Sequence, residues 1–223
     1  MGILIACFIV LLWGVHLIYV LSGVEVSFYS PLFYVHVVIQ AYLFTGLFIT
    51  AHDAMHGSLS GNKNINKFFG LLTSFLFAGL SFKKLFKNHF RHHKSPALED
   101  DPDFYTGSQN IFIWWGVFVL RYISVFQILI MAVIFNLLKI FFNESSIWFF
   151  WVIPAVLATL QLFYFGTYQP HKKPHSHSME PHNARTQNTN HLWAMISCYF
   201  FGYHFEHHES PKTPWWQLYK FKD

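Results

Sequence analysis

The chain has 223 residues, of which 53% are hydrophobic and only 12% are charged. A soluble domain of this length carries about a quarter charged residues, so the composition excludes an ordinary water-soluble protein. The net charge of +4 does not indicate nucleic-acid binding, because the basic residues flank apolar runs instead of forming a patch with exposed aromatic side chains. We therefore expect an all-α integral membrane protein, a single domain over residues 1–223, whose surroundings are a lipid bilayer.

The first two apolar runs predict membrane-spanning helices. Residues 2–21 have no basic residue before them and no small-residue cleavage site after them, which favours a retained helix over a removed signal peptide. The second run begins at Ser30-Pro31, a favourable helix start. As a helix, residues 31–52 would be about 31 Å long, roughly the thickness of the bilayer core. This helix would deliver the sequence AHDAMHG to the membrane surface.

The next segment decides whether two histidine clusters can meet. Residues 68–82 are the one apolar stretch between His56 and His89, and the connection is too short for two crossings and a turn. A single crossing would place the clusters on opposite faces of the membrane. If they cooperate, this stretch must lie along the interface or re-enter, and we expect interfacial helices here.

The second half of the chain predicts two more spans. Arg121 lies inside an apolar stretch, and a charged residue argues against a span that starts ahead of it. We therefore expect residues 111–120 at the interface and a third span over residues 122–140. A fourth span would follow from residue 147 to about 168, whereas the apolar piece at 192–203 is too short to cross.

The distribution of charge predicts an orientation for these four spans. Every Lys and Arg apart from Arg121 and Lys139 falls in segments on the histidine side. The positive-inside rule assigns such a side to the cytoplasm. We therefore expect the histidine clusters and both termini to face the cytoplasm.

Histidine is abundant, with 15 residues, and most of them fall into clusters spaced three or four residues apart. On a helix, such residues share a face. Burying this many imidazoles without a ligand is costly, so the clusters predict a metal site. Their members are His52, His56, His89, His92, His93, His204, His207 and His208.

The number of donors favours two metal ions. A structural zinc needs four ligands and a catalytic zinc needs three plus water, whereas the clusters offer more than that. Imidazole suits iron, zinc, copper and nickel alike, so donor type alone does not select the metal. Further histidines follow at His171, His175, His177, His182 and His191.

The three motifs HDAMH (52–56), HFRHH (89–93) and HFEHH (204–208) resemble the histidine boxes of the membrane fatty acid desaturase and hydroxylase superfamily. Finer matches resemble its beta-carotene ketolases: HDAMHGS (52–58), DPDF (101–104), FGTYQPH (165–171), HNAR (182–185) and GYHFEHHESPKTPWWQL (202–218). The resemblance runs in order from about residue 31 to 218.

This resemblance implies a membrane enzyme that binds two iron ions (Fe2+) and uses O2. It implies two successive hydroxylations at C4, and also at C4', of the beta-ionone ring of beta-carotene, followed by water loss to echinenone or canthaxanthin. An external donor such as ferredoxin with its reductase would supply electrons. The implied iron ligands are the eight clustered histidines and, as the ninth, His171, which follows the fourth span directly; His182 and His191 are weaker candidates.

Two carboxylates inside the boxes, Asp53 and Glu206, are our candidates for residues that support catalysis. Each could accept a ring N–H from a ligating histidine and fix its orientation; the alternative is a solvated helix face. The acidic stretch EDDPD (99–103) is interpreted as a surface loop, although Asp101 and Asp103 match the family pattern.

Other functions remain open at this point. A related membrane di-iron oxygenase, such as a carotenoid hydroxylase, fatty acid desaturase or alkane hydroxylase, shares the boxes. A membrane zinc protease also uses His-x-x-x-His but requires Glu after the first histidine, where this chain has Asp53. A metal transporter should bind its ion near the bilayer midplane on broken helices, whereas these clusters lie at the ends of spans.

Overall fold

The computed structural model describes residues 1–188 and 190–222, and within these residues the fold is helical, with an isolated antiparallel bridge between Thr186 and Tyr203. In chain order the elements are α1 (Gly2–Gly23), α2 (Pro31–His56), α3 (Lys63–Ala78), α4 (Phe82–Lys94), α5 (Ile111–Tyr122), α6 (Val125–Leu138), α7 (Glu144–Ile147), η1 (Trp148–Val152), α8 (Ile153–Phe163), η2 (Tyr164–Tyr168), α9 (Gln169–His171), η3 (His177–Met179), α10 (His191–Cys198), α11 (His204–Glu209) and η4 (Trp215–Lys220).

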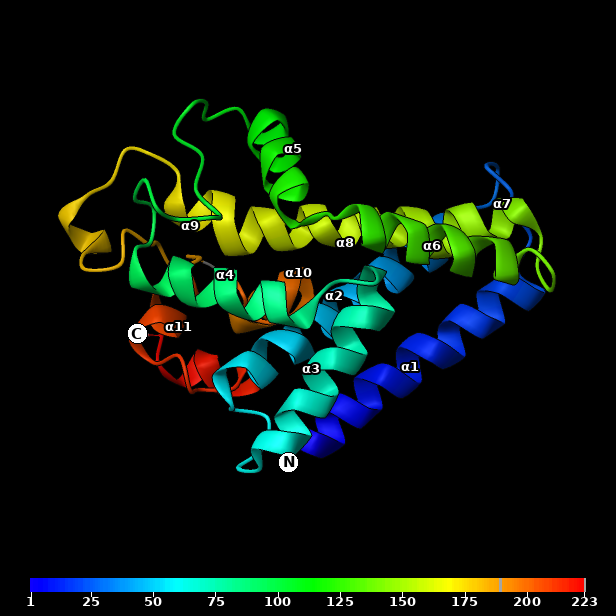
Figure 1. Ribbon diagram of the computed structural model, residues 1–223, viewed down its shortest axis with the longest axis horizontal. Helices are drawn as coiled ribbons and strands as arrows, with labels where there is room; N and C mark the ends of the chain where they lie inside the picture. Colours follow the sequence, from blue (N-terminus) through cyan, green and yellow to red (C-terminus); the bar gives the residue numbers. More distant parts are fainter. Residues whose placement is uncertain (189, 223) are drawn as a thin grey trace.

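Within the residues that the structure describes, three helices are singly long and apolar enough to cross a bilayer. They are α1 with 22 residues, α2 with 26 residues, and the continuous run Glu144–His171 with 28 residues. The last run contains two π-helical turns, η1 and η2. These helices coincide with the first, second and fourth expected spans (Figure 1).

The third expected span differs from the sequence-based expectation. Helix α6 has 14 residues, about 21 Å of helix, and it meets α5 at a bend of 90°. The Lys84 amine donates to the carbonyls of Tyr122 and Ile123, and the Ser124 side chain caps α6. These bonds satisfy backbone groups that a break leaves open. Residues 111–120 therefore do form a helix of their own, but the four-span topology stays a prediction.

A second bend returns the chain to the histidines of α2. Helices α3 and α4 meet at 102°, where Gly79 adopts a left-handed conformation with φ of 63° and Ser81 caps α4. Left-handed backbone favours glycine because it has no Cβ. The bend lays α4 across the end of α2 (Figure 1), so the chain between the first two boxes does not separate them.

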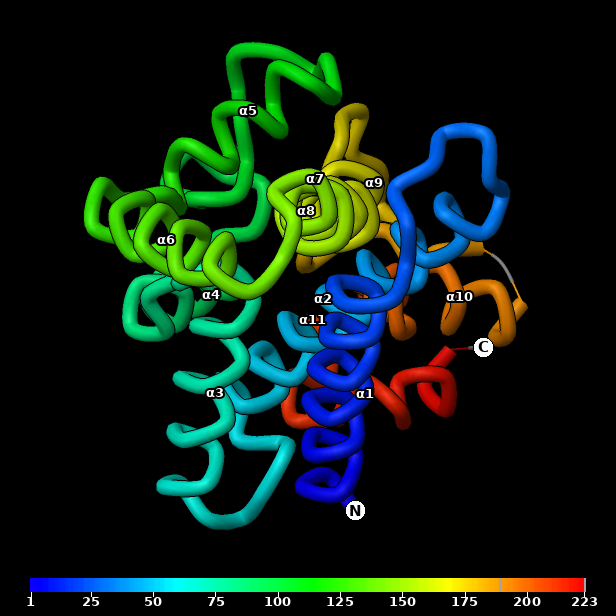
Figure 2. The backbone as a smooth tube through the Cα atoms, turned by 90° about the vertical axis from the view of Figure 1, so that its right-hand side faces the viewer, coloured from blue at the N-terminus to red at the C-terminus, as the bar shows by residue number. Residues whose placement is uncertain are grey.

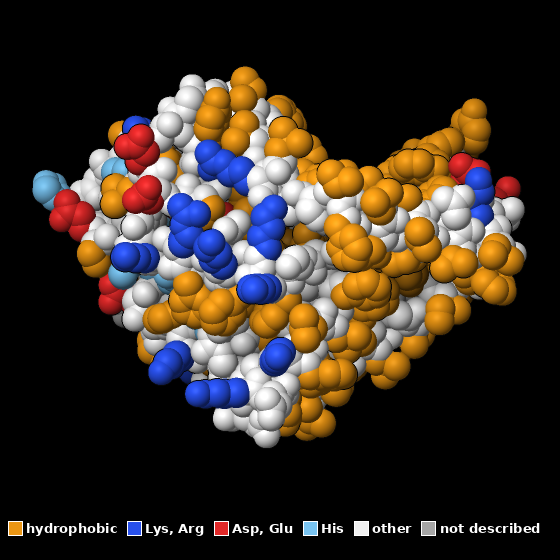
Figure 3. Space-filling view, viewed as in Figure 1, with side chains coloured by type: hydrophobic (Ala, Val, Ile, Leu, Met, Phe, Trp, Pro, Cys, Tyr) orange, Lys and Arg blue, Asp and Glu red, His pale blue; other side chains and the backbone are white. Residues whose placement is uncertain are grey.

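Helix α2 lies at the centre of the molecule and packs against α1, α3 and α8. Figures 1 and 2 show α6 and α8 alongside each other on one side of it and α1 and α3 on the other. Buried side chains at these contacts include Phe44, Leu47, Phe77 and Phe150. In Figure 3 apolar side chains cover most of one half of the visible face, and most of the visible Lys and Arg gather on the other half. An exposed apolar surface of this extent suits contact with lipid.

Candidate metal centre

Four separate parts of the chain bring histidines to one place. The C-terminal end of α2 carries one box, α4 the second and α11 the third, and His171 ends the long run that begins at Glu144. Within each box the helical spacing turns the imidazoles to a common side. The nine histidines predicted as ligands therefore form one connected cluster of ring contacts.

The first group consists of His52, His56, His89 and His207, whose ligand atoms all lie within 4.8 Å of one another. The Nε2 atoms of His56 and His89 are 2.6 Å apart, and those of His52 and His207 are 3.1 Å apart. His56 and His89 are half-buried, whereas the other two are buried. The group thus joins α2, α4 and α11 around one point.

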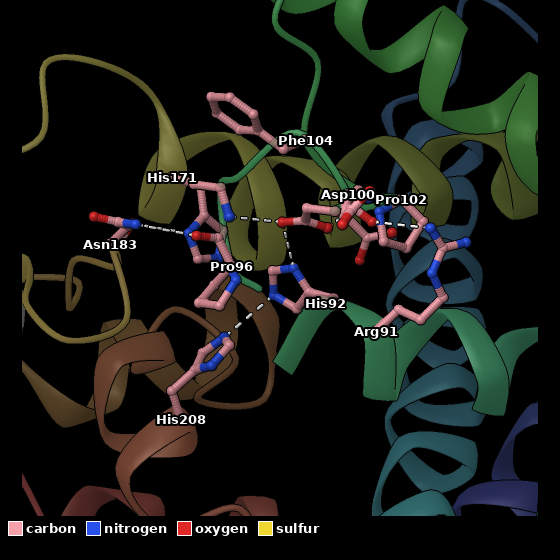
Figure 4. Close-up of polar contacts among 12 residues, drawn as sticks. Arg91, His92, Pro96, Asp100, Pro102, Phe104, His171, Asn183 and His208 are labelled. Carbon is pink, nitrogen blue, oxygen red and sulfur yellow. Dashed lines mark hydrogen bonds and ion pairs between the residues drawn. The ribbon is translucent and has the colours of Figure 1, made fainter. Parts of the chain in front are cut away.

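The second group consists of His92, His171, His204 and His208, all of them buried, with ligand atoms again within 4.8 Å of one another. The Nε2 atom of His208 lies 3.2 Å from that of His92 and 3.1 Å from that of His204. Figure 4 shows His92 pointing at His208, with His171 beside them. This group joins α4, α9 and α11.

His93 lies between the two groups. Its Nε2 atom is 2.9 Å from Nε2 of His207 in the first group, and its ring centroid is 4.3 Å from that of His208 in the second. An imidazole in this position can serve either group.

The weaker candidates for a ninth ligand lie outside both groups. His182 Nε2 contacts a carboxylate oxygen of Glu209 at 2.7 Å, although its ring is 5.3 Å from that of His208. His191 Nδ1 pairs with the Tyr203 hydroxyl at 2.9 Å. The geometry therefore favours His171, while ligation itself stays a prediction.

The nitrogen atoms of the cluster suit a cation. Burial lowers the pKa of His204, His207 and His208 well below its usual value, and neighbouring histidines lower it further, so these rings are neutral and keep a lone pair. Their Nδ1 atoms are buried and have no hydrogen-bond partner within the described residues. Several Nε2 atoms point at one another, and the cluster lacks enough N–H donors to satisfy all of their lone pairs. A metal ion at each group would accept these lone pairs.

Asp101 orients one member of the second group. Its carboxylate accepts hydrogen bonds from His92 Nδ1 at 2.9 Å and from the backbone N–H of Ala97 at 2.7 Å. Burial alone would lower the pKa of His92, but the charge and hydrogen bond of Asp101 outweigh burial and raise this pKa. Burial alone would raise the pKa of Asp101, but the interaction with His92 lowers it. Such an outer carboxylate fixes the tautomer and direction of a ligating imidazole.

The interpretation of EDDPD as a surface loop is therefore wrong for two of its residues. Asp101 is 3% exposed and Asp103 is 9% exposed, whereas Glu99 and Asp100 are exposed as expected. The loop turns its aspartates inward because Arg121 donates to the carbonyls of Pro102 and Phe104. The DPDF match could have indicated that these two aspartates are buried, whereas their charge alone suggested a solvated loop.

His171 is held by a residue that the sequence analysis did not assign. Its Nδ1 atom donates to the backbone carbonyl of Asn183 at 2.9 Å, and the Asn183 amide donates to the carbonyl of Pro96 at 3.1 Å (Figure 4). The π-helical turn η2 directly precedes α9 and changes the direction in which the following side chains point. Within η2, a Cβ on Gly166 would overlap the Phe201 ring, so glycine is required for this packing.

Asp53 and Glu206 are both buried, so the solvated helix face is wrong for each. One oxygen of Asp53 accepts the backbone N–H of Trp215 at 3.2 Å, and the other lies 3.6 Å from His52 Nδ1. Asp53 thereby ties the end of α2 to the segment after the last box. Oε2 of Glu206 has no hydrogen-bond partner within the described residues, and the supporting role of both carboxylates stays a prediction.

A cavity of about 290 Å³ opens beside the histidines. His52, His89, His92 and His204 form part of its wall. The remaining wall is mostly apolar and comes mainly from α2, α3, α5, α8 and the turn before α11; it includes Phe48, Phe77, Trp115, Phe118, Val119, Leu162 and Phe201. An apolar group could therefore reach the histidines through this cavity.

Long apolar helices, two groups of four buried or half-buried histidines and an adjoining apolar cavity define a membrane-protein architecture with a candidate two-metal site. The sequence matches the family described as Fatty acid desaturase over residues 29–145 and 112–223. The chain belongs to the fatty acid desaturase family, a family of oxidoreductases, so it is an enzyme.

Relatives carry the ketolase name that the sequence analysis anticipated. The beta-carotene ketolase of Paracoccus sp. (strain PC1) is 39% identical over 180 residues, which cover 79% of this chain and 74% of the relative. The zeaxanthin 4-ketolase of Chlamydomonas reinhardtii is 38% identical over 184 residues, 79% of this chain and 41% of the relative. The resemblance is thereby confirmed. No solved structure matches the chain.

Proposed function

We propose that the protein is a di-iron carotenoid ketolase that uses O2 to convert C4, and then C4', of the beta-ionone rings of beta-carotene to ketones, giving echinenone and canthaxanthin. The observation that carries the proposal is that histidines of both groups line an apolar cavity. The names of the relatives support a carotenoid substrate.

The residues fit two iron ions. His52, His56, His89 and His207 would hold one, His92, His171, His204 and His208 the other, and His93 would lie between them. Bound iron would supply O2 activation. The chain's own contribution is to keep the imidazoles of α11 neutral by burial and to direct His92 and His171 through Asp101 and Asn183.

The reaction balances over two turnovers at one carbon. In the first, a ring CH2 group, O2, two electrons and two protons give the secondary alcohol and water. In the second, the alcohol with the same reactants gives a geminal diol and water, and the diol then loses water to leave the ketone. The cavity walls would hold the ring and limit the access of water to it.

The size of the cavity supports binding of one end of the substrate. About 290 Å³ lies at the small end of the range for ligand pockets, about 300–1,000 Å³. One ring would fill such a space, while the polyene would extend between the helices toward lipid. Phe48, Phe77 and Phe118 would contact the ring because they line the wall.

Helix α4 offers an entry point for electrons. Its inner side carries histidines of both groups, and its outer side carries four exposed cations that form no ion pair within the described residues. An acidic electron carrier such as ferredoxin, reduced by its own reductase, would be attracted to this surface. The cations are Lys83, Lys87, Arg91 and Lys94.

The membrane orientation is part of the proposal. We expect a multi-pass protein whose histidine groups and termini face the cytoplasm, because Lys139 is the basic residue expected at the far loop and almost all others lie toward the histidines. Reaction of the 139–144 loop with a membrane-impermeant reagent in intact cells would support this orientation. Reaction only after cell lysis would contradict it.

Competing chemistries are less well supported. Asp53 occupies the position where a zinc protease needs its general base, and this carboxylate is buried and bonded to the Trp215 backbone. A related oxygenase acting on another apolar substrate is the nearest alternative. It would share the metal site and differ in product.

The proposal is tested by expression in bacteria that accumulate beta-carotene. Chromatography should detect echinenone or canthaxanthin, and the purified protein should contain about two iron ions per chain. Unchanged beta-carotene with a membrane-inserted, iron-loaded protein and a working electron supply would contradict the ketolase assignment. About one zinc and no iron would contradict the di-iron site.

A further inference from the structure

One carboxylate stands out in the wall of the apolar cavity. Asp103 lines the cavity together with His92, His204 and apolar side chains, and it is 9% exposed. A buried carboxylate is costly unless it finds a partner. In an apolar pocket, a small number of polar groups usually determines which ligand is recognised.

The backbone at Asp103 is fixed on both sides. Its N–H donates to a carboxylate oxygen of Asp101 at 2.8 Å, and its carbonyl accepts the indole N–H of Trp114 at 2.8 Å. Arg121 holds the carbonyls of the two neighbouring residues. The side chain therefore projects from a rigid support, which is what a recognition group requires.

The side chain uses only one of its oxygens within the protein. The Tyr122 hydroxyl donates to Oδ1, and none of the described residues donates to Oδ2. Tyr122 lines the same cavity. One acceptor thus remains for a ligand that carries a hydrogen-bond donor.

Asp103 also lies beside a histidine of the second group. A carboxylate oxygen of Asp103 is within 4.8 Å of a ring nitrogen of His92 and of a carboxylate oxygen of Asp101. A ring whose reacting carbon faces the histidine groups would therefore bring a substituent on that carbon close to Asp103.

We propose that Asp103 binds the hydroxyl group of the singly oxidised ring and retains this alcohol for the second oxidation at the same carbon. The inference rests on the proposed function. It follows from a difference among the three ring states: a CH2 group donates no hydrogen bond, a secondary alcohol donates one, and a ketone only accepts. Asp103 would thus bind the intermediate more strongly than the substrate, and it would not retain the ketone.

The test compares the ratio of alcohol to ketone in products of the wild type, Asp103→Ala and Asp103→Asn. We expect Asp103→Ala to raise the ratio about tenfold, the scale of losing one hydrogen bond to a charged group, while consumption of beta-carotene falls much less. Asp103→Asn should raise the ratio less, because a neutral acceptor binds a hydroxyl more weakly. Ketone formation from supplied 4-hydroxy carotenoid should fall in the same order.

The control is Asp100→Ala, which removes an exposed carboxylate of the same loop that does not line the cavity. Its product ratio should match that of the wild type. An unchanged ratio in both Asp103 variants, or a loss of iron that accounts for their effect, would overturn the inference while leaving the ketolase assignment intact. A wild-type protein that leaves beta-carotene unchanged would overturn the proposed function itself, and this inference with it.

Discussion

The two histidine groups differ in how the protein supports them. In the second group all four histidines are buried, Asp101 accepts a hydrogen bond from His92, and the Asn183 carbonyl accepts one from His171. In the first group His56 and His89 are half-buried, and the nearest carboxylate to His52, that of Asp53, is 3.6 Å away. The second group is therefore the better preorganised of the two.

This difference has a consequence for metal binding. Ligands that already point at the ion lose little conformational freedom when it binds, so preorganisation raises affinity. Greater exposure gives water and chelators easier access to the first group. We expect the second group to hold its metal more tightly, and the first to exchange it more readily.

The largest expected effect comes from His171, the member of the second group that lies at the end of the long helical run. Changing His171→Ala removes one of four nitrogen donors, so ketone formation should fall more than about 100-fold, beyond the effect of losing an outer partner. Product analysis of cells with equal protein levels measures this. The matched control is His182→Ala, whose ring already pairs with Glu209 and which should retain most activity. Equal losses in both variants would contradict the choice of His171.

The comparison of the two histidine groups is sharpened by changing one carboxylate beside each of them. Asp101→Asn removes the charge that orients His92, and we expect a loss of about tenfold to 100-fold in activity or metal affinity. Asp53→Asn should cost less, because Asp53 lies beyond hydrogen-bond distance of His52 and an amide oxygen can still accept the Trp215 N–H. Iron content and activity of the two purified variants give the order. A larger effect at Asp53 would reverse our ranking of the two groups.

The sequence predicted the helical class and the histidine clusters because spacings of three and four residues are local properties of a helix. It also predicted that, if the first two boxes cooperate, residues 68–82 must lie along the interface or re-enter, because the connection is too short for two crossings and a turn. The angle of the break after Tyr122 depends on contacts between distant residues, such as Lys84 with the Tyr122 carbonyl. Such contacts have no local signature.

The same limit applies to the support of the site. Asp101 and Asp103 looked like solvated charges, since their burial depends on Arg121 and Trp114 from the following helix. Asn183 acts on His171 through a backbone carbonyl, and a backbone contact leaves no trace in residue type. The aromatic residues of the cavity wall are likewise chosen by packing among many similar Phe and Trp side chains.

A chelator should distinguish the groups directly. We expect iron to leave the reconstituted protein in two phases with rates that differ several-fold, the faster phase belonging to the more exposed first group. Stopping the reaction at half release and measuring the remaining iron by Mössbauer spectroscopy would show which environment persists. Asp101→Asn should accelerate the slow phase and leave the fast one. Release in one phase in every variant would indicate that the two groups bind metal as a unit.

The smallest expected effect concerns α4, the helix that the two groups share. Because His89 belongs to the first group, His92 to the second and His93 lies between them, electrons that entered through α4 would reach both groups over similar paths. Changing Lys87→Glu should reduce turnover a few-fold, the scale of one surface charge in steering a partner.

The control for α4 is Lys139→Glu, since Lys139 pairs with Glu144 far from the histidines. The effect of Lys87→Glu should shrink at high salt, because screening weakens attraction between exposed charges, and it should disappear when a small uncharged reductant replaces the protein donor. A loss that persists with the small reductant would mean that Lys87 supports the site and not the docking of a carrier. In that case α4 would matter to the two groups because it positions their histidines, and not because it receives electrons.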